Sequence, residues 1–384
     1  MSVTTAYTGA RIFDGEAWHE DKALLVVDGT VLGISGTPPA GAQTVALDGG
    51  LLVPGFVDLQ VNGGGGILLN EQPTLEGIRT ICAAPAPFGT TALLPTLITD
   101  TPEITARAIA AGIEAAARKV PGFLGLHLEG PHLSIARKGA HDPALIRPMD
   151  AADLANLVEA ARSLPVLIST VAAETVTPQQ VAALAGAGII VSVGHSEAGM
   201  STVRAAAAAG ATMVTHLYNA MSQLTNREPG VVGAALSDGR LHAGLIADGI
   251  HVAPEAIGIA LRAKTGPGRI FLVTDAMSVT GTDLESFTLN RRTIYRKNGA
   301  LRLADGTLAG ADLKMIDAIV FMHRTIGLPL EEALRMATVY PAEAVGQGAH
   351  HGHLNPGAQA SFVHLSSDLA VRATWITGEQ VFAA

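Results

Sequence analysis

Several ionisable side chains stand where apolar segments of the sequence end, and their types could do chemistry. Glu129 follows "GFLGLHL", His195 follows "IIVSVG" and His216 follows "TMVT". Asp248 and Asp275 end the runs "LHAGLIA" and "RIFLVT" in the same way. A carboxylate buried at the end of a strand is unfavourable unless a cation offsets its desolvation. One carboxylate and two imidazoles that meet in space form a ligand set of the kind that holds a catalytic divalent metal ion and leaves one position open for water.

Each of these residues also has a simpler interpretation when it is taken alone. A histidine at a strand end is usually a hydrogen-bonded rim residue, Glu129 could accept backbone N–H groups from the next turn, and Asp275 could cap a helix. These explanations would have to hold independently at four strand ends, Glu129, His195, His216 and Asp275. A shared metal site is therefore the stronger interpretation.

The elements that must position these residues are strands followed by helices. From residue 51 onward, apolar runs alternate with Ala-rich helical stretches, which is typical of βα units around a parallel sheet. Eight segments are candidate strands: 51–61, 90–98, 122–129, 166–174, 188–195, 212–220, 241–249 and 269–277. Eight strands separated mainly by helices predict an α/β fold of the closed (β/α)8 barrel type, in which all carboxyl strand ends share one rim. The ionisable residues would then converge on that rim.

The two ends of the chain have a different texture, with short strand patterns and tight turns. Asp14-Gly15, Asp28-Gly29 and Asp48-Gly49 are turn pairs suited to β-hairpins, and the tail returns to the same pattern. Because chain ends often lie close together, we expect both to build one small β domain beside the barrel. The predicted organisation is residues 1–52 and 349–384 in the small domain and residues 53–348 in the catalytic barrel.

The bulk composition limits the classes of function. The 384 residues are 48 % hydrophobic and 15 % charged, with a net charge of −9. This acidic balance argues against a nucleic-acid or membrane-surface partner, although a local positive pocket could still bind a small anion. Cys82 is the sole cysteine, so an internal disulfide and a cysteine-based metal site are excluded. With no signal-peptide pattern and no apolar run of transmembrane length, we expect a cytoplasmic protein.

Seven motifs in order resemble those of the N-acetylglucosamine-6-phosphate deacetylase family, in the amidohydrolase superfamily. They are "GLHLEGPHLSIARKGAH", "VSVGHSEA", "VTHLYNAM", "REPGVVGAAL", "ADGIHV", "LVTDAM" and "LAGADLKM". The resemblance runs from "GFVDLQVNGGGG" to "ATVYPAEAVG" and implies a barrel with a small β-sandwich domain formed by both termini. It implies hydrolysis of N-acetyl-D-glucosamine 6-phosphate to D-glucosamine 6-phosphate and acetate. The alternatives are an N-acetylgalactosamine-6-phosphate deacetylase, a cyclic-amide hydrolase of the superfamily, or a sugar-phosphate binder without chemistry.

The resemblance also assigns roles to residues. It implies metal ligands at Glu129, His195 and His216, a catalytic acid/base at Asp275, and a histidine near the scissile carbonyl at His141. The family's sugar and phosphate contacts fall on Ala140, Asn219, Ala220, Arg227, His251 and a turn made of Leu308, Ala309 and Gly310. The resemblance further implies a homodimer in which Arg227 and His251 reach the phosphate partly across the subunit interface.

One departure from the superfamily pattern concerns the number of metal ions. Many amidohydrolases carry His-x-His at the end of the first barrel strand, where this chain has Gln60 and Asn62 in "DLQVNGG". Amides are far weaker ligands than imidazoles for a transition metal. We therefore predict one divalent metal ion per subunit; Zn, Fe, Mn and Co all suit the ligands, and zinc is preferred.

Overall fold

Parts of the eight apolar segments form one parallel sheet of eight strands, whose neighbours follow the order of the chain. The first segment is not the single strand that the sequence predicts, because its residues 51–54 pair instead with strands from the two chain ends. The computed structural model describes residues 3–384. The barrel strands are β8 (Phe56–Val61), β11 (Thr90–Ile98), β12 (Leu126–Glu129), β13 (Leu167–Val171), β14 (Ile190–Val193), β15 (Met213–Val214), β16 (His242–Leu245) and β17 (Ile270–Leu272). The chain after β17 returns to β8 through a parallel bridge between Val61 and Ala276. The prediction of a (β/α)8 barrel is confirmed.

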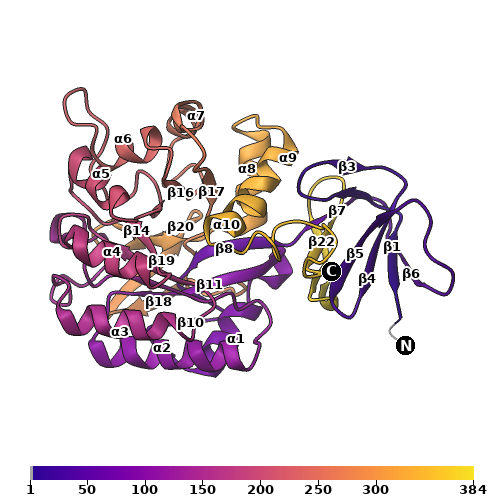
Figure 1. Ribbon diagram of the computed structural model, residues 1–384, viewed down its shortest axis with the longest axis horizontal. Helices are drawn as coiled ribbons and strands as arrows, with labels where there is room; N and C mark the ends of the chain where they lie inside the picture. The colour runs from indigo at the N-terminus through magenta and orange to yellow at the C-terminus, as the bar shows by residue number, and fades with distance from the viewer. Residues whose placement is uncertain (1–2) are drawn as a thin grey trace.

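A helix fills every interval between successive barrel strands, and these helices surround the sheet (Figure 1). They are α1 (Leu75–Ala83), α2 (Pro102–Ala117), α3 (Ala151–Ala161), α4 (Pro178–Gly186), α5 (Met200–Ala208), α6 (Gly230–Ser237) and α7 (Pro254–Ala263), followed by α8 (Met315–Arg324), α9 (Leu330–Ala337) and α10 (Val339–Ala344). The start of α2 shows how the sequence sets these boundaries. Thr101 accepts a hydrogen bond from the Ile104 N–H group at 3.3 Å, and Pro102 follows at the first helical position. Within residues 3–384, no helix is both long and apolar enough to cross a bilayer.

Two further sheets share one core outside the barrel, and the larger one combines strands from both chain ends, as predicted. One has the order β5-β4-β1-β6 and the other β24-β23-β22-β7-β2-β3. Their strands are β1 (Thr5–Thr8), β2 (Arg11–Phe13), β3 (Trp18–His19), β4 (Ala23–Val27), β5 (Thr30–Ser35), β6 (Gln43–Ala46), β7 (Leu51–Pro54), β22 (Phe362–Leu365), β23 (Val371–Ile376) and β24 (Glu379–Ala383). Tyr7, Phe362 and Trp375 pack together in their shared core. Indigo and yellow strands therefore lie side by side at the right of Figure 1.

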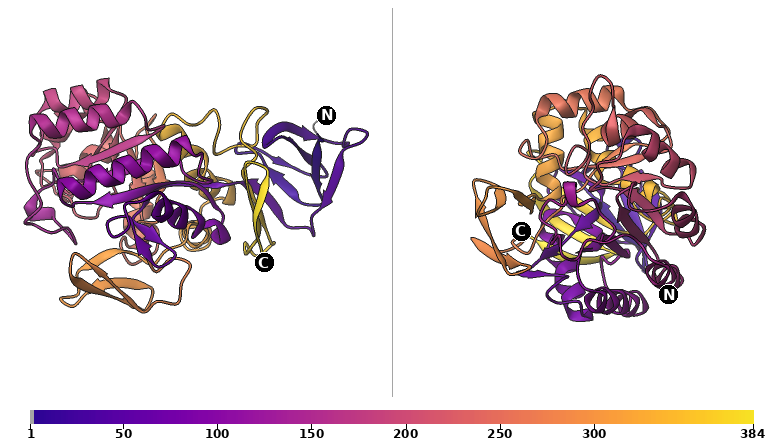
Figure 2. Two further views of the ribbon diagram at one scale, coloured as in Figure 1. Left: turned by 90° about the horizontal axis from the view of Figure 1, so that it is seen from below. Right: turned by 90° about the vertical axis from the view of Figure 1, so that its left-hand side faces the viewer.

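A four-stranded antiparallel sheet between β17 and α8 is the element that the sequence prediction missed. It contains β18 (Ser286–Leu289), β19 (Arg292–Lys297), β20 (Ala300–Leu303) and β21 (Leu308–Ala311). Figure 2 shows it in orange at one side of the barrel. Leu308, Ala309 and Gly310, which we expected in a turn, lie in strand β21. The pairs Asn298-Gly299 and Asp305-Gly306 between these strands are the hairpin signals that could have revealed the sheet.

Candidate active site

The ionisable residues named from the strand ends do converge, and three of them have an unusual backbone. Glu129 is the last residue of β12, and His195, His216 and Asp275 follow β14, β15 and β17 by two or three residues. The φ angles of His195, His216 and Asp275 are 46°, 28° and 52°, in the left-handed region. A side chain there costs of order 1–3 kcal/mol, and such residues gather at functional sites. The surrounding barrel therefore holds these three side chains against local backbone preference.

Three potential ligand atoms form a small triangle. Oε1 of Glu129 lies 3.2 Å from Nε2 of His195 and 3.1 Å from Nε2 of His216, and the two Nε2 atoms are 3.1 Å apart. All three side chains are at least nine-tenths buried. Burial alone would raise the pKa of Glu129, but the two imidazoles beside it hold that pKa well below its ordinary value. Glu129 is therefore a carboxylate, ready to bind a cation.

The hydrogen bond at the far side of the His195 ring decides which nitrogen can bind a metal. Nδ1 of His195 lies 2.7 Å from the backbone carbonyl oxygen of Arg137. A carbonyl oxygen can only accept, so Nδ1 carries the proton and Nε2 presents its lone pair to the site. Nδ1 of His216 has no such partner within residues 3–384.

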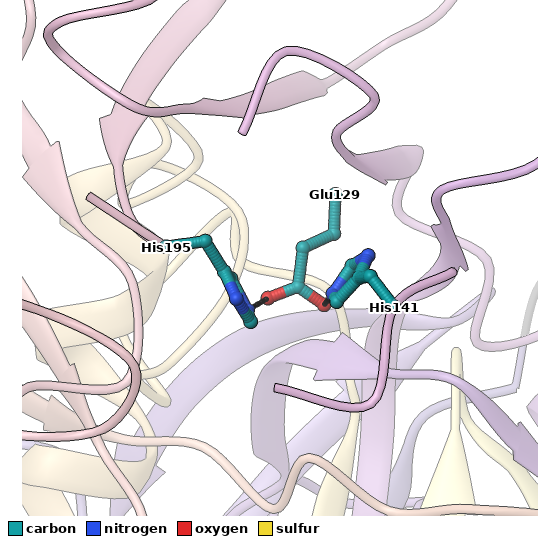
Figure 3. Close-up of side chains that lie close together, drawn as sticks. All are labelled: Glu129, His141 and His195. Carbon is teal, nitrogen blue, oxygen red and sulfur yellow. Dashed lines mark hydrogen bonds and ion pairs between the residues drawn. The ribbon is translucent and has the colours of Figure 1, made fainter. Parts of the chain in front are cut away.

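His141 approaches the other oxygen of Glu129, as Figure 3 shows, with its Nε2 3.9 Å from Oε2. Glu129, His141 and His195 are close enough to hold an ion by distance alone. The backbone N–H group of Thr99, however, donates to Nδ1 of His141 at 3.3 Å, and burial lowers the pKa of His141 to about 3. The Thr99 hydroxyl also lies 2.8 Å from this Nδ1 and can act as a second donor to it. A neutral ring whose Nδ1 accepts carries its proton on Nε2. His141 is thus a hydrogen-bond donor toward the site, and His216 completes the better ligand set.

Asp275 lies beside this cluster, buried at the closing edge of the barrel. Its Oδ1 accepts hydrogen bonds from Nε2 of Gln60 at 3.1 Å and from Nδ2 of Asn62 at 2.6 Å. Burial and the negative charge of Glu129 raise the pKa of Asp275 to about 6. A carboxylate whose pKa lies near neutrality is suited to accept and return a proton.

A cavity of about 310 Å³ opens above these residues, which is at the lower end of the range for small-molecule sites. Its lining includes the predicted site residues Glu129, Ala140, His141, His195, His216, Asn219, Ala220, His251, Asp275, Leu308, Ala309 and Gly310. Nδ1 of His251 is held 2.6 Å from Oδ2 of Asp248, the remaining carboxylate found at a strand end. Arg227 is outside this lining and is exposed on the loop before α6.

The sequence prediction missed several residues that shape the cavity. Arg137, Met277 and Leu289 also line it, and the Arg292 side chain donates to the Ala140 carbonyl oxygen. Leu289 and Arg292 belong to the unpredicted sheet, so only recognition of its hairpins could have found them. The roles of Arg137 and Thr99 depend on backbone atoms, for which residue type gives no signal.

A parallel barrel with a carboxylate, two imidazoles and an aspartate at its rim defines a class of metal-dependent hydrolases. The chain belongs to the amidohydrolase family, whose sequence profile matches residues 51–381. It is therefore a hydrolase that acts on amide bonds, and the resemblance noted from its motifs is confirmed.

Within this family, the chain is similar to proteins named as deacetylases of phosphorylated N-acetyl amino sugars. The N-acetylgalactosamine-6-phosphate deacetylase of Shewanella sp. (strain ANA-3) is 42 % identical over 380 residues, which cover 98 % of this chain and 95 % of that protein. The crystal structure of N-acetylglucosamine-6-phosphate deacetylase from Pasteurella multocida shares 34 % identity, with a TM-score of 0.95 and coverage of 99 % of this chain and 100 % of that chain. The Mycobacterium smegmatis enzyme of the same name, an aspartate-to-alanine mutant in complex with N-acetyl-D-glucosamine-6-phosphate, shares 33 % identity, with a TM-score of 0.90 and full coverage of both chains.

Proposed function

We propose that this protein removes the acetyl group of N-acetyl-D-glucosamine 6-phosphate, giving D-glucosamine 6-phosphate and acetate, with one divalent metal ion per subunit. The observation that carries the proposal is the convergence of Glu129, His195 and His216 with Asp275 and His141 around one cavity. The relatives act on phosphorylated N-acetyl amino sugars by name, which supports this substrate class.

The ligand triangle fits a tetrahedral ion of the zinc type. Metal–nitrogen distances of about 2.0–2.1 Å in a tetrahedron separate neighbouring ligand atoms by about 3.3 Å. The edges among Glu129, His195 and His216 measure 3.1–3.2 Å. Zn, Fe, Mn and Co all suit two imidazoles and a carboxylate, with zinc preferred.

The residues around that ion would divide the chemistry of amide hydrolysis among them. When bound, the ion supplies Lewis acidity that can lower the pKa of a water molecule to about 7. Asp275 accepts the proton of the attacking water as general base. Nε2–H of His141 donates to the acetyl oxygen as negative charge develops there. Asp275 then returns its proton to the leaving nitrogen, so that the sugar departs as an amine.

N-acetylgalactosamine 6-phosphate is the second candidate substrate. The Shewanella relative, 42 % identical, carries that name, and the two sugars differ only in configuration at one carbon. A cyclic-amide hydrolase remains a third alternative within the family. A sugar-phosphate binder without chemistry is disfavoured because such a protein has no use for the set Glu129, His195, His216 and Asp275.

Acetate release from the two sugar phosphates tests the proposal. Protein purified without chelators should release acetate from N-acetylglucosamine 6-phosphate with the higher kcat/KM, and Asp275→Asn is the matched inactive control. A higher kcat/KM for the galactose epimer would transfer the assignment to the second candidate. Acetate from neither sugar phosphate would contradict the proposed function.

The phosphate group and the assembly form a second part of the proposal. Asn219, Ala220 and His251 line the cavity, whereas Arg227 is exposed outside it. Leu224, in the same loop as Arg227, is 57 % exposed. We propose a homodimer in which the partner subunit's Arg227 completes the phosphate site, as the family resemblance implies, because a planar guanidinium matches the geometry of a phosphate group. Such a dimer would work in the cytoplasm.

A further inference from the structure

Two buried amides at the end of β8 are directed at the carboxylates of the site. Gln60 and Asn62 are each 2 % exposed. Nε2 of Gln60 donates to Oε1 of Glu129 at 3.2 Å and to Oδ1 of Asp275 at 3.1 Å. Nδ2 of Asn62 donates to the same Oδ1 at 2.6 Å and to the backbone oxygen of Asp275 at 3.4 Å. All four amide hydrogens thus have a carboxylate or the Asp275 backbone as acceptor.

These contacts make the two oxygens of Asp275 unequal. Oδ1 accepts two hydrogen bonds from β8, whereas Oδ2 accepts none from any side chain or backbone group within residues 3–384. Asp275 lines the cavity, so Oδ2 is the oxygen that remains available to a reacting group. We propose that Gln60 and Asn62 are positioning residues that hold Asp275 by Oδ1 and present Oδ2 for proton transfer, a role that rests on the proposed function.

The electrostatics of the site give Gln60 a second part in this arrangement. Glu129 and Asp275 are two carboxylates in one buried site, and the charge of Glu129 disfavours ionisation of Asp275. One amide nitrogen that donates to both reduces their repulsion without adding a charge. The Gln60 amide therefore bridges the carboxylates of Glu129 and Asp275 and fixes the distance between them.

The backbone of Asp275 explains why a carboxylate in this place needs such support. Its φ of 52° is unfavourable for a residue with a side chain, and the residue follows the end of β17 rather than lying within it. A hydrogen bond of 3.0 Å from its N–H group to the Gln60 carbonyl oxygen ties the same two segments together. Removing the amide donors should leave this backbone link and the barrel in place while freeing the carboxylate to rotate.

The chain offers a matched control in Asn70. This asparagine is also buried, and its Nδ2 donates to the Ile98 backbone oxygen at 3.0 Å and to Oδ2 of Asp100 at 2.8 Å. Asn62 and Asn70 thus each make one bond to a carboxylate and one to a backbone oxygen, but only Asn62 contacts Asp275. Asn62→Leu and Asn70→Leu delete equivalent bonds with a side chain of similar size.

Steady-state kinetics on both sugar phosphates, with metal analysis and thermal unfolding of each protein, test the proposal. Asn62→Leu should lose about 100-fold in kcat, because loss of orientation near 1 Å has an effect of that order. Its KM should stay within about threefold of wild type, because the proposed role of Asn62 is to orient Asp275 rather than to bind the sugar. Its metal content should remain that of wild type. Asn70→Leu should keep wild-type kcat even where its melting temperature falls. Gln60→Met, which deletes the other donor, should repeat the loss in kcat and carries the test if Asn62→Leu does not fold.

Three outcomes would overturn the proposal. They are a donor-deletion variant that keeps wild-type kcat, a loss of kcat that Asn70→Leu shares, and a loss of kcat that only tracks lost metal. If wild-type protein releases no acetate from either sugar phosphate, the proposed function fails together with this role. If wild-type protein is active and the variants are unaffected, only the positioning role fails.

Discussion

Substituting Gly310 by alanine should damage catalysis through the backbone of Asp275. Gly310 lies in β21 with a φ of +65°, and a Cβ there would stand 2.5 Å from Cγ of Met277 and 2.9 Å from the Asp275 backbone oxygen. Ordinary contact begins at 3.4 Å, so these atoms would have to recede by about 0.9 Å and 0.5 Å. Met277 is a flexible side chain, but the Asp275 oxygen also accepts the Ala311 N–H group at 2.9 Å and cannot move freely. The added methyl group therefore pushes on the proposed proton carrier.

Two effects of the substitution can be told apart by their size: the backbone strain of alanine at a positive φ and the displacement of Asp275. Alanine in the left-handed region costs roughly 1–2 kcal/mol of stability, and overpacking of a buried site typically adds about 1–3 kcal/mol. Gly306 is the matched control, because its φ is +88° and its added Cβ would meet nothing within 4 Å. Gly306→Ala should show the strain alone. Gly310→Ala should show both effects on stability. It should also lose roughly tenfold in kcat/KM, because a shift of about 0.5 Å at Asp275 is half of the 1 Å misplacement that costs about 100-fold.

The assay is acetate release at several substrate concentrations, with urea unfolding of both variants and the wild type. Equal kcat/KM for Gly310→Ala and Gly306→Ala would refute the reasoning, because only the Cβ added at position 310 presses on Asp275 and its neighbour Met277. A loss in Gly310→Ala confined to stability would refute it equally, since β21 would then not hold Asp275 in place.

Four further predictions address the site and its surroundings. Asp275→Asn should lose about 10²–10⁴-fold in kcat while keeping metal and substrate binding, as measured by single-turnover kinetics and metal analysis. Metal analysis of wild-type protein should give near one equivalent per chain, and His195→Ala should lose both the metal and the activity; two tightly held equivalents in active protein would contradict this. Arg227→Ala should lower kcat/KM for the 6-phosphate sugar far more than for the unphosphorylated sugar. Mixing Arg227→Ala chains with Asp275→Asn chains should restore activity once subunits exchange. Subunit exchange without recovery of activity would exclude action of Arg227 across the interface. Burial raises the pKa of Asp58 to about 7, so the contribution of this group to the free energy of unfolding is full below about pH 4 and is lost as the pH rises through 7, a change of about 4 kcal/mol. In urea unfolding, the free energy of unfolding of Asp58→Asn should therefore fall less between pH 4 and pH 7 than that of the wild type. An equal fall in the two proteins would contradict the assignment.

The barrel and the rim residues could be predicted because one regularity governs both. Parallel strands in a (β/α)8 barrel all end at the same face, so the last residues of apolar runs identify that face without any knowledge of distances. Glu129, His195, His216 and Asp275 were found in this way, and the structure brings them together. His195, His216 and Asp275 have positive φ angles, but each follows its strand by only a few residues, so each still lies on the predicted rim.

The finer chemistry of the site could not be predicted because backbone atoms provide much of it. The Arg137 carbonyl oxygen selects the protonated nitrogen of His195 across 58 residues of sequence, and the Thr99 N–H group does the same for His141 across 42 residues. Every residue except proline has both backbone groups, so neither contact leaves a trace in residue type. The sheet β18–β21 was missed for another reason: its turn pairs are visible, but how it packs against Asp275 depends on tertiary contacts.

The meaning of Gln60 and Asn62 changes most between the sequence and the structure. In the sequence, Gln60 and Asn62 stand where many amidohydrolases have the two histidines of a second metal site. In the structure, the two amides donate hydrogen bonds to Glu129 and Asp275. The charges support a single ion on independent grounds. His141 is neutral, imidazoles bind metals as neutral rings, and the two carboxylates sum to −2, so one divalent cation neutralises the buried cluster. A second divalent ion would leave an excess of +2 among these buried side chains, with amide N–H groups facing the place where further ligands would be needed. Amide donors and one cation are therefore a consistent set, because the donors hold the two carboxylates together without adding charge.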